Sequence, residues 1–305
     1  MTAPAHVGSD ALTVVAGVRC TLGEGPTWDL QGGVVRWVDV DRGHLWEATF
    51  DGGELGAPRL AVECGATLGA AVHAEDGGLL LARTRHLEHR DAAGTTLGSV
   101  RLVAEGVASR LNDGACDPAG RYLVGSLAQD GRTGGERLWR LEHDGTVIVV
   151  DDDLTLSNGL GWSPDGSSMY QVDTVPGTLY VRDYDVGSGT VGPRRALVEI
   201  RDASPDGLTV DAEGNVWVAI WGAGELRCFS PAGRLLQVVQ TGAPLTTSCA
   251  FAGPDLDVLV VTTAGKAEDG VRQTDRGGAL LALRPGVVGR ATTAWKPAHL
   301  GADER

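Results

Sequence analysis

Short apolar runs broken by turn residues dominate the hydrophobic pattern of this chain. Runs such as Val34–Val40 and Asn215–Ile220 are rich in β-branched and aromatic residues and are bounded by Gly, Asp or Pro. No long stretch repeats its apolar residues every 3.6 positions, and a helical turn is expected only within residues 59–64 or 267–273. The pattern therefore predicts an all-β protein.

One turn pattern recurs along the chain at a nearly even spacing. Its six copies, of which the last is degenerate and ends in Leu instead of Gly, occupy residues 29–32, 74–77, 117–120, 163–166, 211–214 and 253–256. Asp, Ser or Pro near the start and Gly at the end, with its positive φ, are typical of tight turns. Successive copies lie 42 to 48 residues apart. That period fits blades of four antiparallel strands, so we predict a single six-bladed β-propeller over residues 1–305, with flexible ends at about 1–10 and 300–305.

The repeat also places a set of oxygen-bearing side chains in one register. We call the position eight residues before the end of each turn the axial register; it holds Glu24, Gly69, Asn112, Asn158, Asp206 and Ser248. In a propeller these positions begin the inner strands that line the axis, and four of the six carry a carboxylate or an amide. Asn-Gly and Asp-Gly are ordinary turn formers, and each motif by itself is explained that way. Their shared register instead favours a site for a hard cation, with Ca²⁺, Mg²⁺ and Mn²⁺ as the metals that oxygen ligands suit best.

Charge and cysteine content exclude several classes of partner. The formal net charge of −14 argues against binding to nucleic acid or to an anionic membrane surface. No signal peptide is visible, and the apolar runs are too short to cross a bilayer. The five cysteines are odd in number and form no C-x-x-C pair, which indicates reduced thiols. We therefore expect a cytoplasmic protein, a monomer or weak oligomer, that acts on a small molecule.

Other candidate chemistry is weaker. His86 and His89 are three positions apart, and on a strand such residues do not face the same way, so a solvated segment is favoured over a metal site. The chain has no G-x-S-x-G elbow and no glycine-rich phosphate loop. Trp28 and Trp221 lie near the axial motifs and are expected to wall a pocket there.

These motifs together resemble the senescence marker protein/gluconolactonase family, also called regucalcin-like. The resemblance runs from about residue 23 to residue 264 and rests on the segments 23–28, 110–114, 117–122, 157–160, 205–207 and 247–249. It implies that Glu24, Asn158 and Asp206 bind one divalent metal cation. Ca²⁺ is expected first, with Zn²⁺, Mn²⁺, Mg²⁺ or Fe²⁺ as alternatives.

The resemblance also implies a substrate-binding set. Arg110 and Asn112 match the residues that contact the substrate in the family. A further acidic contact follows the next strand, where Asp130 is the candidate. The family often has Met and Glu in that stretch, whereas this chain has Leu127 and the shorter Asp130.

The expected activity is metal-dependent hydrolysis of sugar (aldono-) lactones by metal-activated water. Asp206 is then both a metal ligand and the base that accepts a proton from water, and Arg110 stabilises developing negative charge. Two alternatives stay open at this point. One is a phosphotriesterase or organophosphatase with a similar propeller metal, and the other is a non-enzymatic propeller that binds a metal or ligand.

Overall fold

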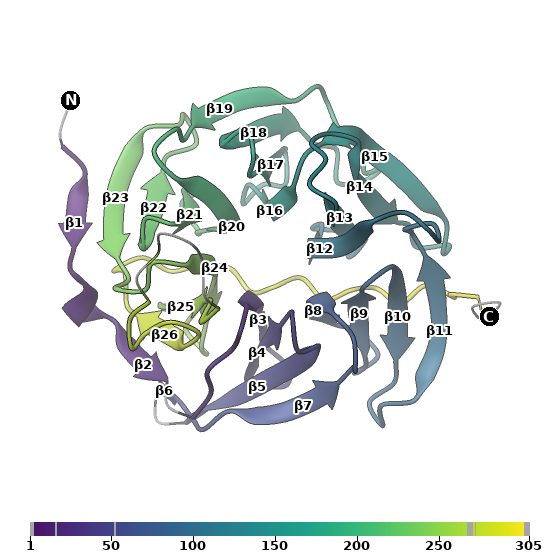
Figure 1. The fold of residues 1–305 in the computed structure, drawn as a ribbon, viewed down its shortest axis with the longest axis horizontal. Coiled ribbons are helices and arrows are strands. Elements are labelled where there is room, and N and C mark those ends of the chain that lie inside the picture. Colours follow the sequence, from purple (N-terminus) through teal and green to yellow (C-terminus); the bar gives the residue numbers. More distant parts are fainter. Residues whose placement is uncertain (1–2, 16, 52, 267–270, 272, 302–305) are drawn as a thin grey trace.

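The computed structural model describes residues 3–301 except 16, 52, 267–270 and 272, and it forms a ring of six β-sheets around a central axis (Figure 1). This arrangement confirms the predicted all-β, six-bladed propeller. The only helical segment in the described part of the chain is the three-residue 3-10 turn η1 (Ser9–Ala11), and no described helix is long and apolar enough to span a membrane.

Each blade is an antiparallel sheet whose strands follow one another outward from the axis. The first three blades consist of β3 (Gly23–Asp29), β4 (Val34–Asp39), β5 (His44–Asp51), β6 (Glu54–Leu55) and β7 (Arg59–Glu63); β8 (Leu68–His73), β9 (Leu79–Arg83), β10 (His86–Arg90) and β11 (Thr96–Arg101); and β12 (Ser109–Cys116), β13 (Tyr122–Ala128), β14 (Glu136–Leu141) and β15 (Val147–Leu154). The last three consist of β16 (Ser157–Trp162), β17 (Ser168–Asp173), β18 (Thr178–Asp183) and β19 (Arg195–Glu199); β20 (Ser204–Val210), β21 (Val216–Trp221), β22 (Glu225–Phe229) and β23 (Leu235–Gln240); and β24 (Thr246–Ala252), β25 (Val258–Thr263) and β26 (Leu280–Leu283). The strand β7 corrects one expectation, because residues 59–63 pair with β5 and form no helical turn. The other expected helical turn lies largely outside the described residues.

The N-terminal segment closes the ring. β2 (Thr13–Val15) adds the outer strand of the sixth blade by pairing antiparallel with β26. β1 (Ala5–Val7) pairs in parallel with β23 of the fifth blade. The expected flexibility of residues 1–10 therefore falls partly on a paired strand, and residues 1–2 and 302–305 lie outside the described part.

Two requirements explain the sequence of the repeated turns: a residue with positive φ at the end, and an Asp side chain that binds backbone N–H groups within the turn. The Oδ1 of Asp117 accepts hydrogen bonds from the N–H groups of Ala119 and Arg121, both at 2.9 Å. In the degenerate copy Leu256 takes the left-handed conformation, with φ of 54°. In the first copy the positive φ belongs to Gly33 and not to Gly32, so this turn is one residue longer than the repeat predicts.

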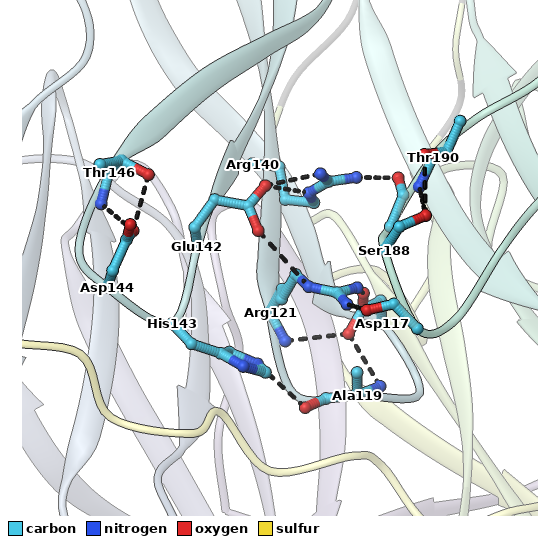
Figure 2. A network of polar contacts seen from close by, with 12 residues as sticks. Asp117, Ala119, Arg121, Arg140, Glu142, His143, Asp144, Thr146, Ser188 and Thr190 are labelled. Carbon is cyan, nitrogen blue, oxygen red and sulfur yellow. Dashed lines mark hydrogen bonds and ion pairs between the residues drawn. The ribbon is translucent and has the colours of Figure 1, made fainter.

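A buried polar network joins the third and fourth blades (Figure 2). The carboxylate of Asp117 accepts a hydrogen bond from the Tyr184 hydroxyl at 2.6 Å and another from the Arg121 guanidinium at 2.5 Å. Arg121 also donates to the carbonyl oxygen of Gly187 at 2.7 Å. The third blade's turn thus connects directly to the loop between β18 and β19.

After β26 the chain crosses the face of the ring that lies behind the axis in Figure 1; we call residues 284–301 the C-terminal strap. Its Val288 carbonyl accepts from Ala212 of the fifth blade at 3.0 Å, and the N–H of Trp295 donates to His73 of the second blade at 2.9 Å. Trp295 is 1% exposed. The strap therefore ties blades on opposite sides of the ring.

Candidate functional site

A cavity of about 450 Å³ lies at the axis, among the starts of the inner strands. Its lining comes from five blades and consists of Leu22, Glu24, Arg110, Asn112, Leu127, Leu156, Asn158, Thr174, Val175, Ser204, Asp206, Trp221 and Lys266. Four of the six axial-register residues are among them. These four side chains alone come from positions up to 182 residues apart in the sequence, from Glu24 to Asp206.

The inner strands share a local irregularity at this level, and it aims the side chains at the axis. The ladder register shifts in β12 between Leu111 and Gly114, in β16 between Ser157 and Leu160, and in β20 between Pro205 and Leu208. Each shift leaves two residues opposite one, which is a β-bulge, and a bulge redirects the side chains it contains. The axial residues of these blades, Asn112, Asn158 and Asp206, are the first of the two unpaired residues in each bulge.

The glycines that follow the axial residues are required by close packing between inner strands. A Cβ on Gly159 would lie 2.8 Å from the carbonyl oxygen of Asp206, and one on Gly207 would lie 2.1 Å from the Ser248 Oγ. Gly69, in the second blade, has the same role, because its Cβ would lie 2.6 Å from the Asn112 carbonyl oxygen. This blade therefore supplies space and no ligand.

Glu24 departs from the repeat by one residue. It still pairs with Val38, and the two unpaired residues of its bulge are Gly25 and Pro26. The longer first turn, which ends at Gly33, accounts for this shift. Glu24 lines the cavity nonetheless.

Asn158 and Asp206 present unpartnered oxygens in a nearly dry setting. They are 4% and 5% exposed, and the Oδ1 atom of each is buried without a hydrogen-bond partner. The Nδ2 of Asn158 donates to Thr174 Oγ1 at 3.0 Å, an orientation that leaves the amide oxygen on the other side. Buried polar atoms nearly always have a hydrogen-bond partner or a ligand. The partner of these two oxygens therefore has to come from outside the protein.

Burial of the two carboxylates outweighs the positive charges of Arg110 and Lys266 beside them. Burial, followed by the negative charges of Asp206 and Asp113, raises the pKa of Glu24 well above its ordinary value. Burial and the charge of Asp113 likewise raise the pKa of Asp206. Two carboxyl groups held together in a low-dielectric site favour a bound cation or a proton.

The donor set fits a hard divalent cation. Two carboxylates and an amide offer oxygen atoms only, which is the chemistry that Ca²⁺, Mg²⁺ and Mn²⁺ prefer. Within the described residues no group of three or more His, Cys, Asp and Glu side chains forms a metal-binding cluster. With Glu24, Asn158 and Asp206 as its protein ligands, a metal at the axis would have open positions for other molecules.

Arg110 and Asn112 form a pair on one wall. The Nη1 of Arg110 donates to Asn112 Oδ1 at 2.8 Å and to the Leu111 carbonyl at 2.9 Å. Asn112 Nδ2 donates to the Ser157 carbonyl at 3.0 Å. The contact between Arg110 and Asn112 places both side chains on the same side of β12.

Asp130 does not line the cavity. Its side chain is 46% exposed and forms an ion pair with Arg132 at 2.8 Å. In β13, the strand before Asp130, Leu127 lines the cavity. A role for Asp130 in substrate binding stays a prediction that this arrangement does not support.

The other aromatic and metal candidates are also placed. Trp221 lines the cavity, as expected, whereas Trp28 is buried in the core against Phe50. His86 and His89 have separate acidic partners, Glu88 and Asp76. The five cysteines are free thiols, as their spacing predicts.

Sequence reasoning missed three polar residues near the axis. Thr174 and Lys266 line the cavity, and Asp113 lines a smaller cavity of about 130 Å³ further along the axis, together with Ser248 and with Thr292 of the strap. The sequence could have pointed to Asp113, since it follows Asn112 in the same motif. The signal that could have pointed to Lys266 is the rarity of lysine, since the chain has only one other, Lys296.

The chain is similar to known proteins along most of its length. Residues 22–265 match the family model described as the SMP-30/Gluconolactonase/LRE-like region. The sequence is 37% identical to pentonolactonase XacC of Haloferax volcanii, over 92% of this chain and 96% of that protein. It is 33% identical to regucalcin of Xenopus laevis, over 90% and 94%. Among solved structures, a calcium-binding protein, regucalcin, from Agrobacterium tumefaciens matches with a TM-score of 0.86 at 25% identity, over 97% of this chain and all of the other.

Proposed function

This chain belongs to the SMP-30/gluconolactonase/LRE-like family, and from that premise we propose that it hydrolyses sugar lactones in the axial cavity with the help of one divalent cation. The observation that carries the proposal is the convergence of Glu24, Asn158 and Asp206, with two buried oxygens that have no protein partner. The pentonolactonase relative supports the substrate class. The calcium-binding structural relative supports Ca²⁺ as the first metal to test.

Glu24, Asn158 and Asp206 would hold the cation through their oxygens. The cation, when bound, supplies Lewis-acid polarisation of the lactone carbonyl and lowers the pKa of water. A bound cation would also favour the ionised form of both carboxyl groups, against the burial that raises their pKa values. The ligands are therefore matched to a metal in charge as well as in atom type.

The protein's own groups would then act on the substrate and the proton. Asp206 would accept a proton from the attacking water through the carboxylate oxygen that does not bind the cation. Arg110 uses one nitrogen, Nη1, to hold Asn112 and Leu111. A guanidinium has five donors, so Nη2 and Nε are left to bind lactone oxygens and to stabilise negative charge as the ring opens.

The cavity wall supports the exclusion of bulk water. Leu22, Leu127 and Leu156 contribute apolar surface, and Trp221 adds a large ring. A cavity of this size with a few convergent polar groups is typical of small-molecule sites.

The proposal is tested by turnover and metal content on one preparation. We expect chelated protein to lose hydrolysis of aldonolactones and to regain it when Ca²⁺, Mg²⁺, Mn²⁺ or Zn²⁺ is restored, with one cation bound per chain. A fluorophosphate in the same assay separates the phosphotriesterase alternative. Turnover of no lactone by the metal-replete protein would favour the ligand-binding alternative.

A further inference from the structure

One of the chain's two lysines is fixed on the wall of the axial cavity. The backbone N–H of Lys266 donates to the carbonyl of Thr21 at 3.1 Å, which anchors the residue beside the start of β3. Its Nζ lies 5.1 Å from the centre of the Trp221 ring, within range of a cation–π interaction. Both side chains line the cavity. The backbone hydrogen bond thus fixes the residue at the cavity, and the Trp221 ring holds its ammonium there.

Lys266 contributes to the net charge of the cavity lining. Four charged side chains line it: Glu24, Asp206, Arg110 and Lys266. With the two carboxylates ionised their formal charges cancel, so a bound divalent cation would give the cavity a formal charge of about +2. The chain as a whole carries −14. The loaded site would thus attract anions on a molecule that otherwise repels them.

The two basic side chains of the cavity wall, Arg110 and Lys266, differ in the hydrogen-bond donors that they present to a substrate. Arg110 is 8% exposed, and its Nη1 is committed to its own strand. Lys266 is half-buried, and its positive charge lowers the pKa of Asp206 against the larger effect of burial. An ammonium is a compact charge with three donors, which suits a carboxylate or a phosphate.

We propose that Lys266 recognises an anionic substituent of the substrate, so that the preferred lactones are those of sugar acids with a second charged group, either a carboxylate or a phosphate. This inference rests on the proposed lactonase function. A neutral lactone offers Lys266 only uncharged oxygen acceptors, whereas a carboxylate or phosphate substituent offers an ionised one and forms a stronger ion-paired hydrogen bond.

The first test compares substrates. We expect wild-type protein to have a higher kcat/KM for glucaro-1,4-lactone, 6-phosphogluconolactone or both than for glucono-1,5-lactone. Lys266→Met is expected to lower the ratio of anionic to neutral kcat/KM about tenfold or more, since hydrogen bonds to charged groups contribute on that scale. Lys266→Arg should restore most of it. The carboxylate and phosphate substrates show which anion the site prefers.

The exposed Lys296 on the C-terminal strap provides the matched control. Lys296→Met removes the same charge from the opposite face of the ring, so the substrate ratio should stay at the wild-type value. Higher salt should reduce the anionic preference of the wild-type protein, because a half-exposed ammonium is screened.

A second test needs no turnover and no variant. Acetylation with an N-hydroxysuccinimide ester, read by peptide mass spectrometry, reports Lys266 and Lys296 separately. With glucarate at about ten times its dissociation constant, acetylation of Lys266 should slow about tenfold by simple occupancy, while Lys296 reacts at its original rate. Gluconate at the same concentration should protect Lys266 less.

The outcomes separate the two proposals. If no lactone is hydrolysed, the proposed function fails. If neutral lactones are hydrolysed but Lys266→Met leaves the substrate ratio unchanged, or glucarate does not protect Lys266, the lactonase proposal stands and the role of Lys266 is refuted.

Discussion

At the scale of single residues, the site is defined by what its atoms lack. Asn158 and Asp206 each bury an oxygen without a partner, and Glu24 and Asp206 each bury a carboxyl group whose pKa burial raises. In a core built only for stability, both features are unfavourable by about 1–3 kcal/mol for each unpartnered group. Their convergence is explained by a ligand that supplies positive charge and coordination.

Replacing Asp206 is expected to remove both the metal and the base. Asp206→Ala should lower kcat/KM for lactones by more than about 100-fold, because loss even of a supporting group around a metal costs about 10- to 100-fold. Calorimetric titration of the metal should show lost affinity, and circular dichroism should show retained sheet. Asp202→Ala, an exposed partner of Arg227 on the loop before β20, is the control and should behave as wild type. Near-normal turnover of Asp206→Ala in metal-replete buffer would contradict the assignment.

Replacing Arg110 tests how the substrate is held. Arg110→Ala should lower kcat/KM more for a hydroxylated lactone than for an unsubstituted ring lactone, because a site built to bind hydroxyls discriminates against their absence. Metal content should stay at one per chain, since a guanidinium cannot be a metal ligand. Arg195→Ala, on exposed β19, is the control.

The comparison between the two lactones decides the role of Arg110. An equal fall for both would mean that Arg110 acts on the carbonyl or through general electrostatics. No fall for either would remove it from the site.

At the scale of elements, the β-bulge and the capped turn of each inner strand have separate roles. The bulge at the start of the strand aims a side chain at the axis, and the turn at its end fixes the pairing with the next strand. The turn of the third blade does more, because Asp117 caps that turn through the N–H of Ala119 (Figure 2) and also accepts a hydrogen bond from Tyr184 of the fourth blade.

Asp117→Ala is therefore expected to destabilise the fold strongly. It removes two hydrogen bonds from backbone N–H groups, the hydrogen bond from Tyr184 and the closest ion pair of the buried Arg121, which keeps Glu142 at 3.4 Å. Together these losses are on the order of 3 kcal/mol. Urea unfolding monitored by tryptophan fluorescence measures the change. Asp144→Ala provides the control, since Asp144 caps an exposed turn of the same blade through Thr146. Equal effects of the two substitutions would show that the contact between blades contributes little.

At the scale of the whole molecule, metal binding and stability are linked through the axial carboxyl groups. The raised pKa values of Glu24 and Asp206 mean that the metal-free folded protein binds protons that the unfolded chain has released. Its stability from these groups is present at low pH and is lost as the pH rises through the raised values. A cation needs both groups ionised, so protons compete with it.

We accordingly expect the increase in Tm on adding metal to be large at about pH 8 and small at about pH 5, near the ordinary carboxyl range. Differential scanning fluorimetry with and without Ca²⁺, and after chelation, measures it. The double variant Glu24→Gln, Asp206→Asn should lose the increase at both pH values. A metal-induced shift that is the same at both would place the binding site elsewhere.

Much of this molecule was predictable because the signals are local. The turn chemistry at residues 117–120 and its copies sets the blade period, and the oxygens of Asn112, Asn158 and Asp206 share one distance from their turns. The prediction is less accurate where local geometry shifts. The first turn takes its positive φ at Gly33, which the spacing alone does not distinguish from Gly32.

The sequence by itself determined the number of blades, the strands within them and the level at which side chains meet the axis, because turns and alternating strands depend on neighbouring residues. Only the tertiary structure decided which side chains share the cavity. It brought in Lys266, which belongs to no repeat, and left Asp130 paired with Arg132 at the surface. The physical reason is that Lys266 and Asp130 lie on loops between strands. The paths of such loops depend on contacts between distant parts of the chain, and no periodic pattern along the sequence records those contacts.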